Sequence, residues 1–198
     1  SWVSYLPQAL IAQNKVHWIQ TSSSTSWFPT AEQLETKIKN IKNKNLILFL
    51  NSPNNPSGMV CKNLKEIASV AKKNKLLILS DEIYSELTFD NQYKSISNFY
   101  PEGTIVSTGL SKWCGAGGWR LGFFAIPSSL KELKNSLKVL CSESFTSVSA
   151  PIQYAAVEAY KGNHSSYLNA VKKILYFTGN YVYENLKSNV INVNKPEG

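Results

Sequence analysis

Residues 107–122 read Ser-Thr-Gly-Leu-Ser-Lys-Trp-Cys-Gly-Ala-Gly-Gly-Trp-Arg-Leu-Gly and follow directly on a short apolar run. They place Lys112 ahead of a glycine cluster and Arg120, the only arginine among the 21 cationic residues of the chain. A guanidinium offers a rigid fork of donors that suits a phosphate or carboxylate, whereas an ammonium is a point charge on a flexible stem. The stretch therefore predicts a lysine beside an anion-binding arginine, on a pliable loop that follows a strand.

Polar side chains also follow two earlier apolar runs. Asn51–Gly58 reads Asn-Ser-Pro-Asn-Asn-Pro-Ser-Gly directly after Leu46–Leu50, and Ser80–Tyr84 reads Ser-Asp-Glu-Ile-Tyr directly after Leu76–Leu79. Open α/β sheets bind their ligands just beyond the carboxyl ends of the strands. We therefore expect these polar groups to meet at one edge of a sheet.

Helical patterns separate the predicted strands. Three pairs have the spacing of a capping box at the start of a helix: Thr30 with Gln33, Asn63 with Glu66, and Ser129 with Glu132. Strands that alternate with capped helices indicate an α/β sandwich built on a largely parallel sheet. The predicted strands cover 16–19, 46–50, 76–79, 105–107, 121–126 and 190–193, and the predicted helices 6–14, 31–41, 64–73, 130–141, 151–160 and 166–187.

Composition narrows the class of protein. The 198 residues carry a net charge of +8, but the lysines are scattered and no nucleic-acid-binding module accompanies them, so we expect no nucleic-acid partner. No apolar run approaches the ~20 residues that span a bilayer, so we expect no membrane partner. Cys61, Cys114 and Cys141 have no paired spacing, which indicates free thiols in a reducing, cytoplasmic compartment. With His17 and His164 as the only histidines, a histidine-based metal site is not expected.

In this order, the three polar stretches resemble the class I and II aminotransferases, the fold-type I enzymes that use pyridoxal 5′-phosphate (PLP). The resemblance implies a three-layer α/β/α sandwich with a mostly parallel sheet, in which strand 121–126 is antiparallel. It also implies that Lys112 forms the Schiff base with PLP and later moves a proton at the substrate α-carbon. Ser111 and Arg120 are implied to bind the cofactor phosphate.

The same resemblance assigns the groups around the cofactor ring. Asp81 would pair with the pyridine nitrogen and raise its pKa, which keeps the ring protonated as an electron sink. Tyr84 and Asn55 would hydrogen-bond the phenolic oxygen of the ring. Trp2, in the segment Ser-Trp-Val-Ser-Tyr, is the candidate aromatic that stacks on the ring, although a core position suits a tryptophan equally well.

Two departures from the family pattern accompany the resemblance. The family often has a phosphate-binding serine three residues before the lysine, where this chain has Gly109; losing that donor would weaken phosphate binding unless a backbone amide replaces it. Family members are also considerably longer, so we expect the cofactor core of a larger enzyme. Residues 1–163 would form most of the large PLP-binding domain, and 164–198 the linking helix and the start of the small domain.

The predicted function is transfer of an amino group between an amino acid and a 2-oxo acid, in a full-length protein that forms a homodimer. The identity of the amino donor stays open. A PLP-dependent lyase or a cyclopropane-forming synthase of the same fold would share every residue named above. A non-catalytic PLP-binding sensor, or a fragment that is inert by itself, are the alternatives from another class.

Overall fold

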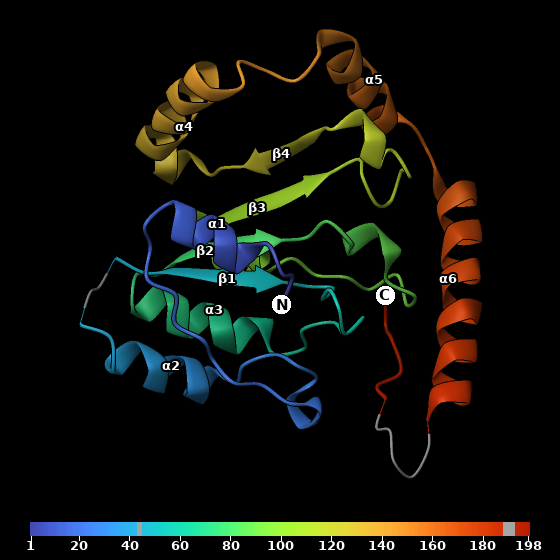
Figure 1. Ribbon diagram of the computed structural model, residues 1–198, viewed down its shortest axis with the longest axis horizontal. Helices are drawn as coiled ribbons and strands as arrows, with labels where there is room; N and C mark the ends of the chain where they lie inside the picture. The colour runs from blue at the N-terminus through green and yellow to red at the C-terminus, as the bar shows by residue number, and fades with distance from the viewer. Residues whose placement is uncertain (43–44, 188–192) are drawn as a thin grey trace.

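Runs of apolar residues become the central strands of one sheet (Figure 1). The computed structural model describes residues 1–42, 45–187 and 193–198. The first three strands are parallel and the fourth runs antiparallel to the third, which confirms the predicted α/β class. The strands, in spatial order, are β1 (Ile47–Asn51), β2 (Leu77–Asp81), β3 (Thr104–Gly109) and β4 (Gly122–Ala125).

The helices follow the predicted pattern closely. Each predicted helix is present, with ends that differ from the prediction by up to three residues. The helices are α1 (Tyr5–Ile11), α2 (Ala31–Lys39), α3 (Leu64–Lys73), α4 (Lys131–Ser144), α5 (Ala150–Lys161) and α6 (Ser165–Leu186). Single 3-10 turns cover Ser23–Thr25, Ser85–Leu87, Ile96–Asn98, Pro101–Gly103, Gly117–Trp119 and Ser128–Leu130. Among the helices of the described ranges, none combines the length and apolarity needed to cross a membrane.

The exposure of side chains alternates along β1, because successive side chains of a strand point to opposite faces of the sheet. Leu48 and Leu50 pack into the core formed with α2 and α3, whereas Ile47 and Phe49 remain about half exposed on the opposite face. On that face Tyr5 of α1 lies against Phe49, with ring centres 5.3 Å apart. Helices therefore contact both faces, as the predicted three-layer arrangement requires.

One of the three predicted capping boxes is present. Thr30 Oγ1 accepts from the backbone N–H of Gln33 at 3.1 Å, and Gln33 Oε1 accepts from the N–H of Thr30 at 2.9 Å. These reciprocal bonds satisfy two donors that the first turn of α2 leaves without a helical partner. The start of α2 thus agrees with its sequence signal.

The other two capping boxes are wrong. Asn63 donates to the backbone oxygen of Pro29 at 3.0 Å, and Ser129 donates to the backbone oxygen of Glu102 at 2.7 Å. Neither side chain caps its helix, because each is used to join the start of its helix to a distant segment. α3 nevertheless forms, since its apolar face packs into the core. No residue of α4 is buried in the described chain.

One predicted strand is absent from the described residues, and another cannot be compared with the structure. Residues 14–22 have no regular secondary structure, so the predicted strand Val16–Ile19 is wrong; β1 pairs with β2 alone among the described strands, which leaves this segment without a partner. Most of the predicted strand Val190–Val193 lies outside the described residues.

Candidate active site

Asp81 ends β2 at the centre of the sheet edge. The strand register places it between Asn51 of β1 and Ser107 of β3. Its Oδ1 accepts from the backbone N–H of Ile83 at 3.2 Å, which fixes one side of the carboxylate. The polar groups predicted to follow the strands are therefore gathered at the carboxyl ends of β1, β2 and β3.

Tyr5 of α1 binds the other carboxylate oxygen. Its Oη donates to Asp81 Oδ2 at 2.6 Å. Burial raises the pKa of Tyr5 well above its ordinary value, and the hydrogen bond to Asp81 raises it further, so the phenol stays protonated and donates. Sequence reasoning missed Tyr5, although it chose Trp2 in the same segment. Trp2 meets Tyr5 edge-on with ring centres 5.4 Å apart and is 41% exposed.

Asn55, Tyr84 and Lys112 come together from three different loops. Asn55 Nδ2 donates to Tyr84 Oη at 3.4 Å, a long hydrogen bond. Lys112 Nζ lies 5.5 Å from the centre of the Tyr84 ring, within the range of a cation–π contact. An amide, a phenol and an amine are thus placed within reach of a single small molecule.

Asn51 is a second residue that sequence reasoning did not assign to the site. It is only 6% exposed, and its side chain forms two hydrogen bonds. Nδ2 donates to the backbone oxygen of Asp81 at 3.1 Å, and Oδ1 accepts from the backbone N–H of Asn55 at 2.8 Å. Asn51 therefore fixes the loop of Asn55 relative to Asp81. Its position directly after the apolar run Leu46–Leu50 was the signal in the sequence that could have identified it.

The loop that carries Lys112 is closed at its base, where the N–H of Leu110 donates to the backbone oxygen of Leu121 at 3.2 Å. Arg120 has a left-handed backbone with a φ of 55° and an exposed side chain, whose Nη1 donates to Gly117 O at 2.7 Å. Among the described residues, no hydrogen bond joins the side chain of Arg120 to that of Lys112. Ser111 is half-buried on the same loop.

The packing of β3 on β4 explains the glycine at position 109. A Cβ on Gly109 would lie 2.6 Å from the backbone oxygen of Leu121 and 2.9 Å from the Cα of Gly122. Both distances are shorter than a real Cβ contact, and both partners are backbone atoms. A serine there would require the two strands to move apart, so no side-chain donor can be supplied from this position in the present packing.

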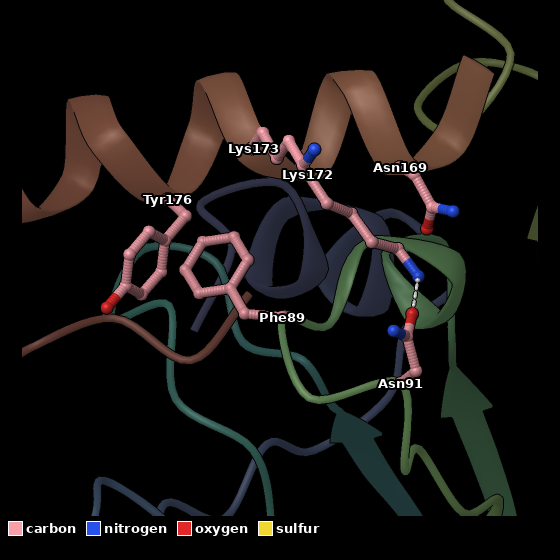
Figure 2. Close-up of a pocket in the computed structure, with 6 residues that line it drawn as sticks. All are labelled: Phe89, Asn91, Asn169, Lys172, Lys173 and Tyr176. Carbon is pink, nitrogen blue, oxygen red and sulfur yellow. Dashed lines mark hydrogen bonds between the residues drawn. The ribbon is translucent and has the colours of Figure 1, made fainter. Parts of the chain in front are cut away.

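A separate hollow of about 390 Å³ lies between α6 and the loop that begins at Phe89 (Figure 2). Its walls combine aromatic rings, amides and two lysines, and none of the predicted site residues lines it. Lys172 Nζ donates to Asn91 Oδ1 across it at 2.6 Å. The hollow therefore lies between α6 and the loop after β2, and it is separate from the cluster formed by Asn55, Tyr84 and Lys112.

Comparison with known proteins identifies the family. A family model described as aminotransferase class I and II matches residues 1–198. The chain belongs to this family. The aspartate aminotransferase of Bacillus sp. (strain YM-2) is 37% identical to this aminotransferase-family chain over 171 residues, which are 83% of the chain and 42% of that protein. The aspartate aminotransferase of Thermotoga maritima is 30% identical over 202 residues, covering 100% of the chain and 51% of that protein.

Solved structures agree with this assignment. The structure of Thermus thermophilus aspartate aminotransferase with maleate has a TM-score of 0.90 and 26% sequence identity to the chain. The match covers 100% of this aminotransferase-family chain and 51% of that structure. The chain thus spans about half the length of the curated relatives it matches. Membership of the family implies PLP as the cofactor.

Proposed function

We propose that this chain carries the cofactor site of a PLP-dependent aminotransferase, which moves an amino group between an amino acid and a 2-oxo acid. The observation that carries the proposal is the convergence of Asn55, Tyr84 and Lys112 beside the end of β2, where Asp81 is located. The donor set fits PLP: a carboxylate for the ring nitrogen, a phenol and an amide for the ring oxygen, and an amine for the aldehyde. When bound, PLP supplies an electron sink for negative charge that develops at the substrate α-carbon.

Asp81 would hold a proton on the pyridine nitrogen by direct charge pairing. Its carboxylate is already oriented, because Tyr5 binds Oδ2 and the Ile83 N–H binds Oδ1. Each carboxylate oxygen accepts more than one hydrogen bond, so these contacts leave acceptor sites for the cofactor. A carboxylate fixed in this way requires little reorganisation when the ring arrives.

Asn55 and Tyr84 would both donate to the phenolic oxygen of the ring. Lys112 would hold the cofactor and, once an amine substrate displaces it, accept and return the proton of the substrate α-carbon through Nζ. The 5.5 Å distance from Lys112 Nζ to the Tyr84 ring supports this shared site. One amine would therefore serve as both anchor and proton carrier.

Arg120 and Ser111 are proposed to bind the phosphate. The guanidinium is held in its own loop by one hydrogen bond to Gly117 O, which leaves its other N–H groups available to an anion. Trp2 is proposed to stack on the ring, and its edge-on contact with Tyr5 supports a location near Asp81. Since Gly109 cannot supply a hydroxyl, backbone N–H groups of the loop are the expected replacement.

The proposed domain division follows the same assignment. The whole sheet lies within residues 1–163, the proposed large domain, and α6 opens the proposed linking segment 164–198. A homodimer and the amino acid and 2-oxo acid substrates are proposed from the family. The two relatives named above are aspartate aminotransferases, so aspartate is the first amino donor to test.

The test is to add PLP to the purified protein, record the visible spectrum, reduce with borohydride and map the modified peptide. We expect a saturable spectral change and a single covalent label on Lys112. The same treatment of Lys112→Ala should give neither. A label scattered over the other lysines, with wild type and variant alike, would contradict the proposed site.

A further inference from the structure

Residues 193–198, the described part of the segment after α6, lie against the loops after β1 and β2 (Figure 1). The backbone N–H groups of Glu197 and Gly198 donate to the oxygen of Gly58 at 2.7 and 3.1 Å. On the other side, the N–H of Phe89 donates to the oxygen of Glu197 at 3.0 Å. The backbone of Glu197 is therefore bonded to both loops, one of which carries Asn55 and the other of which follows Tyr84.

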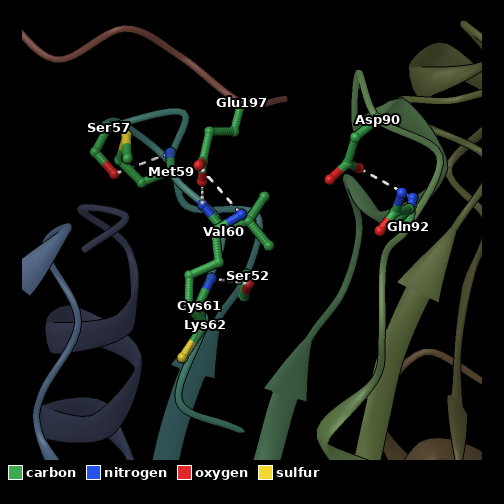
Figure 3. A network of polar contacts seen from close by, with 9 residues as sticks. All are labelled: Ser52, Ser57, Met59, Val60, Cys61, Lys62, Asp90, Gln92 and Glu197. Atoms are coloured by element: carbon green, nitrogen blue, oxygen red, sulfur yellow. Dashed lines mark hydrogen bonds and ion pairs between the residues drawn. The ribbon is translucent and has the colours of Figure 1, made fainter.

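The side chain of Glu197 is anchored as well (Figure 3). Its Oε2 accepts from the backbone N–H of Val60 at 2.8 Å, and its Oε1 lies 3.1 Å from Lys62 Nζ. The Lys62 side chain is mostly exposed, so the ion pair is expected to contribute little. The charge-assisted bond to a backbone N–H is the stronger contact.

Pro196 fits between two glycines, at each of which even a Cβ would come too close to the proline. A Cβ on Gly58 would lie 2.8 Å from Pro196 Cβ, and a Cβ on Gly179 of α6 would lie 2.8 Å from Pro196 Cγ. Gly58 also has a φ of 66°, which side chains rarely adopt. The segment is thus packed closely on α6 and on the loop of Asn55 at once.

A short chain of hydrogen bonds connects Glu197 to the site. Gly58, which accepts from Glu197, donates through its own N–H to the oxygen of Asn54 at 2.8 Å. The next residue, Asn55, is held by Asn51 through its backbone and reaches Tyr84 Oη through its side chain. The loop is consequently fixed at its start by Asn51 and at its end by Glu197.

The loop after β2 also contacts α6 and the residues that follow it. The Phe89 ring meets Tyr176 of α6 edge-on, with ring centres 5.6 Å apart (Figure 2). Lys195 Nζ lies 5.6 Å from the centre of the same Tyr176 ring. Contacts from α6 and from the segment after it therefore converge on the loop that begins just beyond Tyr84.

We infer that Glu197 is a positioning residue, which ties the segment after α6 to residues 58–62 and thereby keeps Asn55 within hydrogen-bonding reach of Tyr84. Its importance for catalysis rests on the proposed function, whereas its effect on the loop does not. By this inference the side chain and the backbone of Glu197 couple the proposed linking segment to the proposed cofactor site.

The experiment compares Glu197→Ala, Glu197→Gln and Lys62→Met in the full-length protein. Amide hydrogen exchange is measured first without PLP, at Val60 and at Asn55, whose N–H binds Asn51. We expect Glu197→Ala to accelerate exchange roughly tenfold at both amides, because the carboxylate that accepts from Val60 is lost. Gln can still accept from Val60 N–H and should restore most of the protection, and Lys62→Met should leave it unchanged.

The outcomes distinguish a residue that positions Asn55 from one that only binds Val60. If Glu197→Ala accelerated exchange at Val60 but left Asn55 unchanged, the inference would be overturned. It would also be overturned if both amides were protected equally in all three variants. With PLP added, Glu197→Ala should also raise the dissociation constant of the cofactor several-fold, while Glu197→Gln stays near wild type. If wild type itself fails to bind PLP, the proposed function fails, but the exchange result at Asn55 still decides the role of Glu197.

Discussion

Tyr5 Oη donates a 2.6 Å hydrogen bond to Asp81 Oδ2 and so joins α1 to the end of β2, across 76 positions of sequence. The same phenol packs on Phe49 of β1, which fixes its ring. A carboxylate that is to pair with a ring nitrogen must point in one direction, and Tyr5 supplies that orientation from a distant part of the chain. The proposed site is therefore supported, through Asp81, by a residue of α1.

Tyr5→Phe should lower the free energy of unfolding by roughly 1–2 kcal/mol, because the ring is kept while a hydrogen bond to a charged group is lost. Urea unfolding at neutral pH measures the difference, with the exposed Tyr154→Phe as control. The folded-state pKa of Tyr5 is raised, so its contribution is present below about pH 10 and is lost as the pH rises further. The gap between wild type and Tyr5→Phe should accordingly shrink in alkali; a constant gap would argue against the bond.

A second pH dependence of the free energy of unfolding is expected from Glu82, which is next to Asp81. It is 5% exposed, and its Oε1 accepts from Ser80 and Ser95 hydroxyls at 2.8 and 2.6 Å. Burial raises the pKa of Glu82, and the hydroxyls offset this only in part. The stability linked to this raised pKa is present at acidic pH and is lost as the pH rises through the raised value.

Glu82→Gln removes that titration. The free energy of unfolding of wild type should therefore rise relative to Glu82→Gln when the pH is lowered from 7 to 5. Urea titrations at several pH values follow the difference, and the exposed Glu86→Gln serves as control. Parallel pH profiles for wild type and Glu82→Gln would refute the predicted linkage.

Gly109→Ser, the residue common in the family, should be harmful here. Its Cβ would meet backbone atoms of Leu121 and Gly122, and such overpacking costs about 1–3 kcal/mol. Gly118→Ser is the matched control, since a Cβ there meets nothing within 4 Å. Thermal or urea unfolding distinguishes the two variants, and equal stability would show that β3 and β4 can separate without cost.

Lys112→Ala should reduce aminotransferase turnover by roughly 10³-fold or more, because both the anchor and the proton carrier are removed. Lys112 is exposed, so the circular dichroism spectrum and the unfolding midpoint should stay close to wild type. A comparably exposed lysine, Lys138, gives the control variant Lys138→Ala. Turnover of Lys112→Ala near the wild-type rate would remove the basis of the proposed mechanism.

The sequence allowed the strands and the polar groups at their ends to be predicted, because both are local signals. An apolar run ends at Asn51 or Asp81, and the residues just after such a run lie at the sheet edge in any parallel α/β fold. The resemblance to the family assigned Asn55, Tyr84 and Lys112 to one site, and the structure brings the three side chains close together. Their chemical roles remain predictions.

Contacts between distant segments were beyond that reasoning. The side chain of Asn63 has the right type and position for a cap, yet it bonds Pro29, and nothing local distinguishes the two uses. The bond from Glu197 to Val60 spans 137 positions and has no periodic signature. Tyr5 did offer a hint, since it lies three residues after the chosen Trp2, to whose backbone oxygen its N–H donates.

The hydrogen bond between Leu110 and Leu121 makes the loop between them a closed ring attached to the β3–β4 hairpin. Lys112 and Arg120 therefore lie on one loop that leaves and rejoins the sheet at the same point, whereas Tyr84 lies in the turn after β2. By the roles proposed above, the amine and the guanidinium are thus carried by one stretch of backbone whose two ends meet, and the phenol by another.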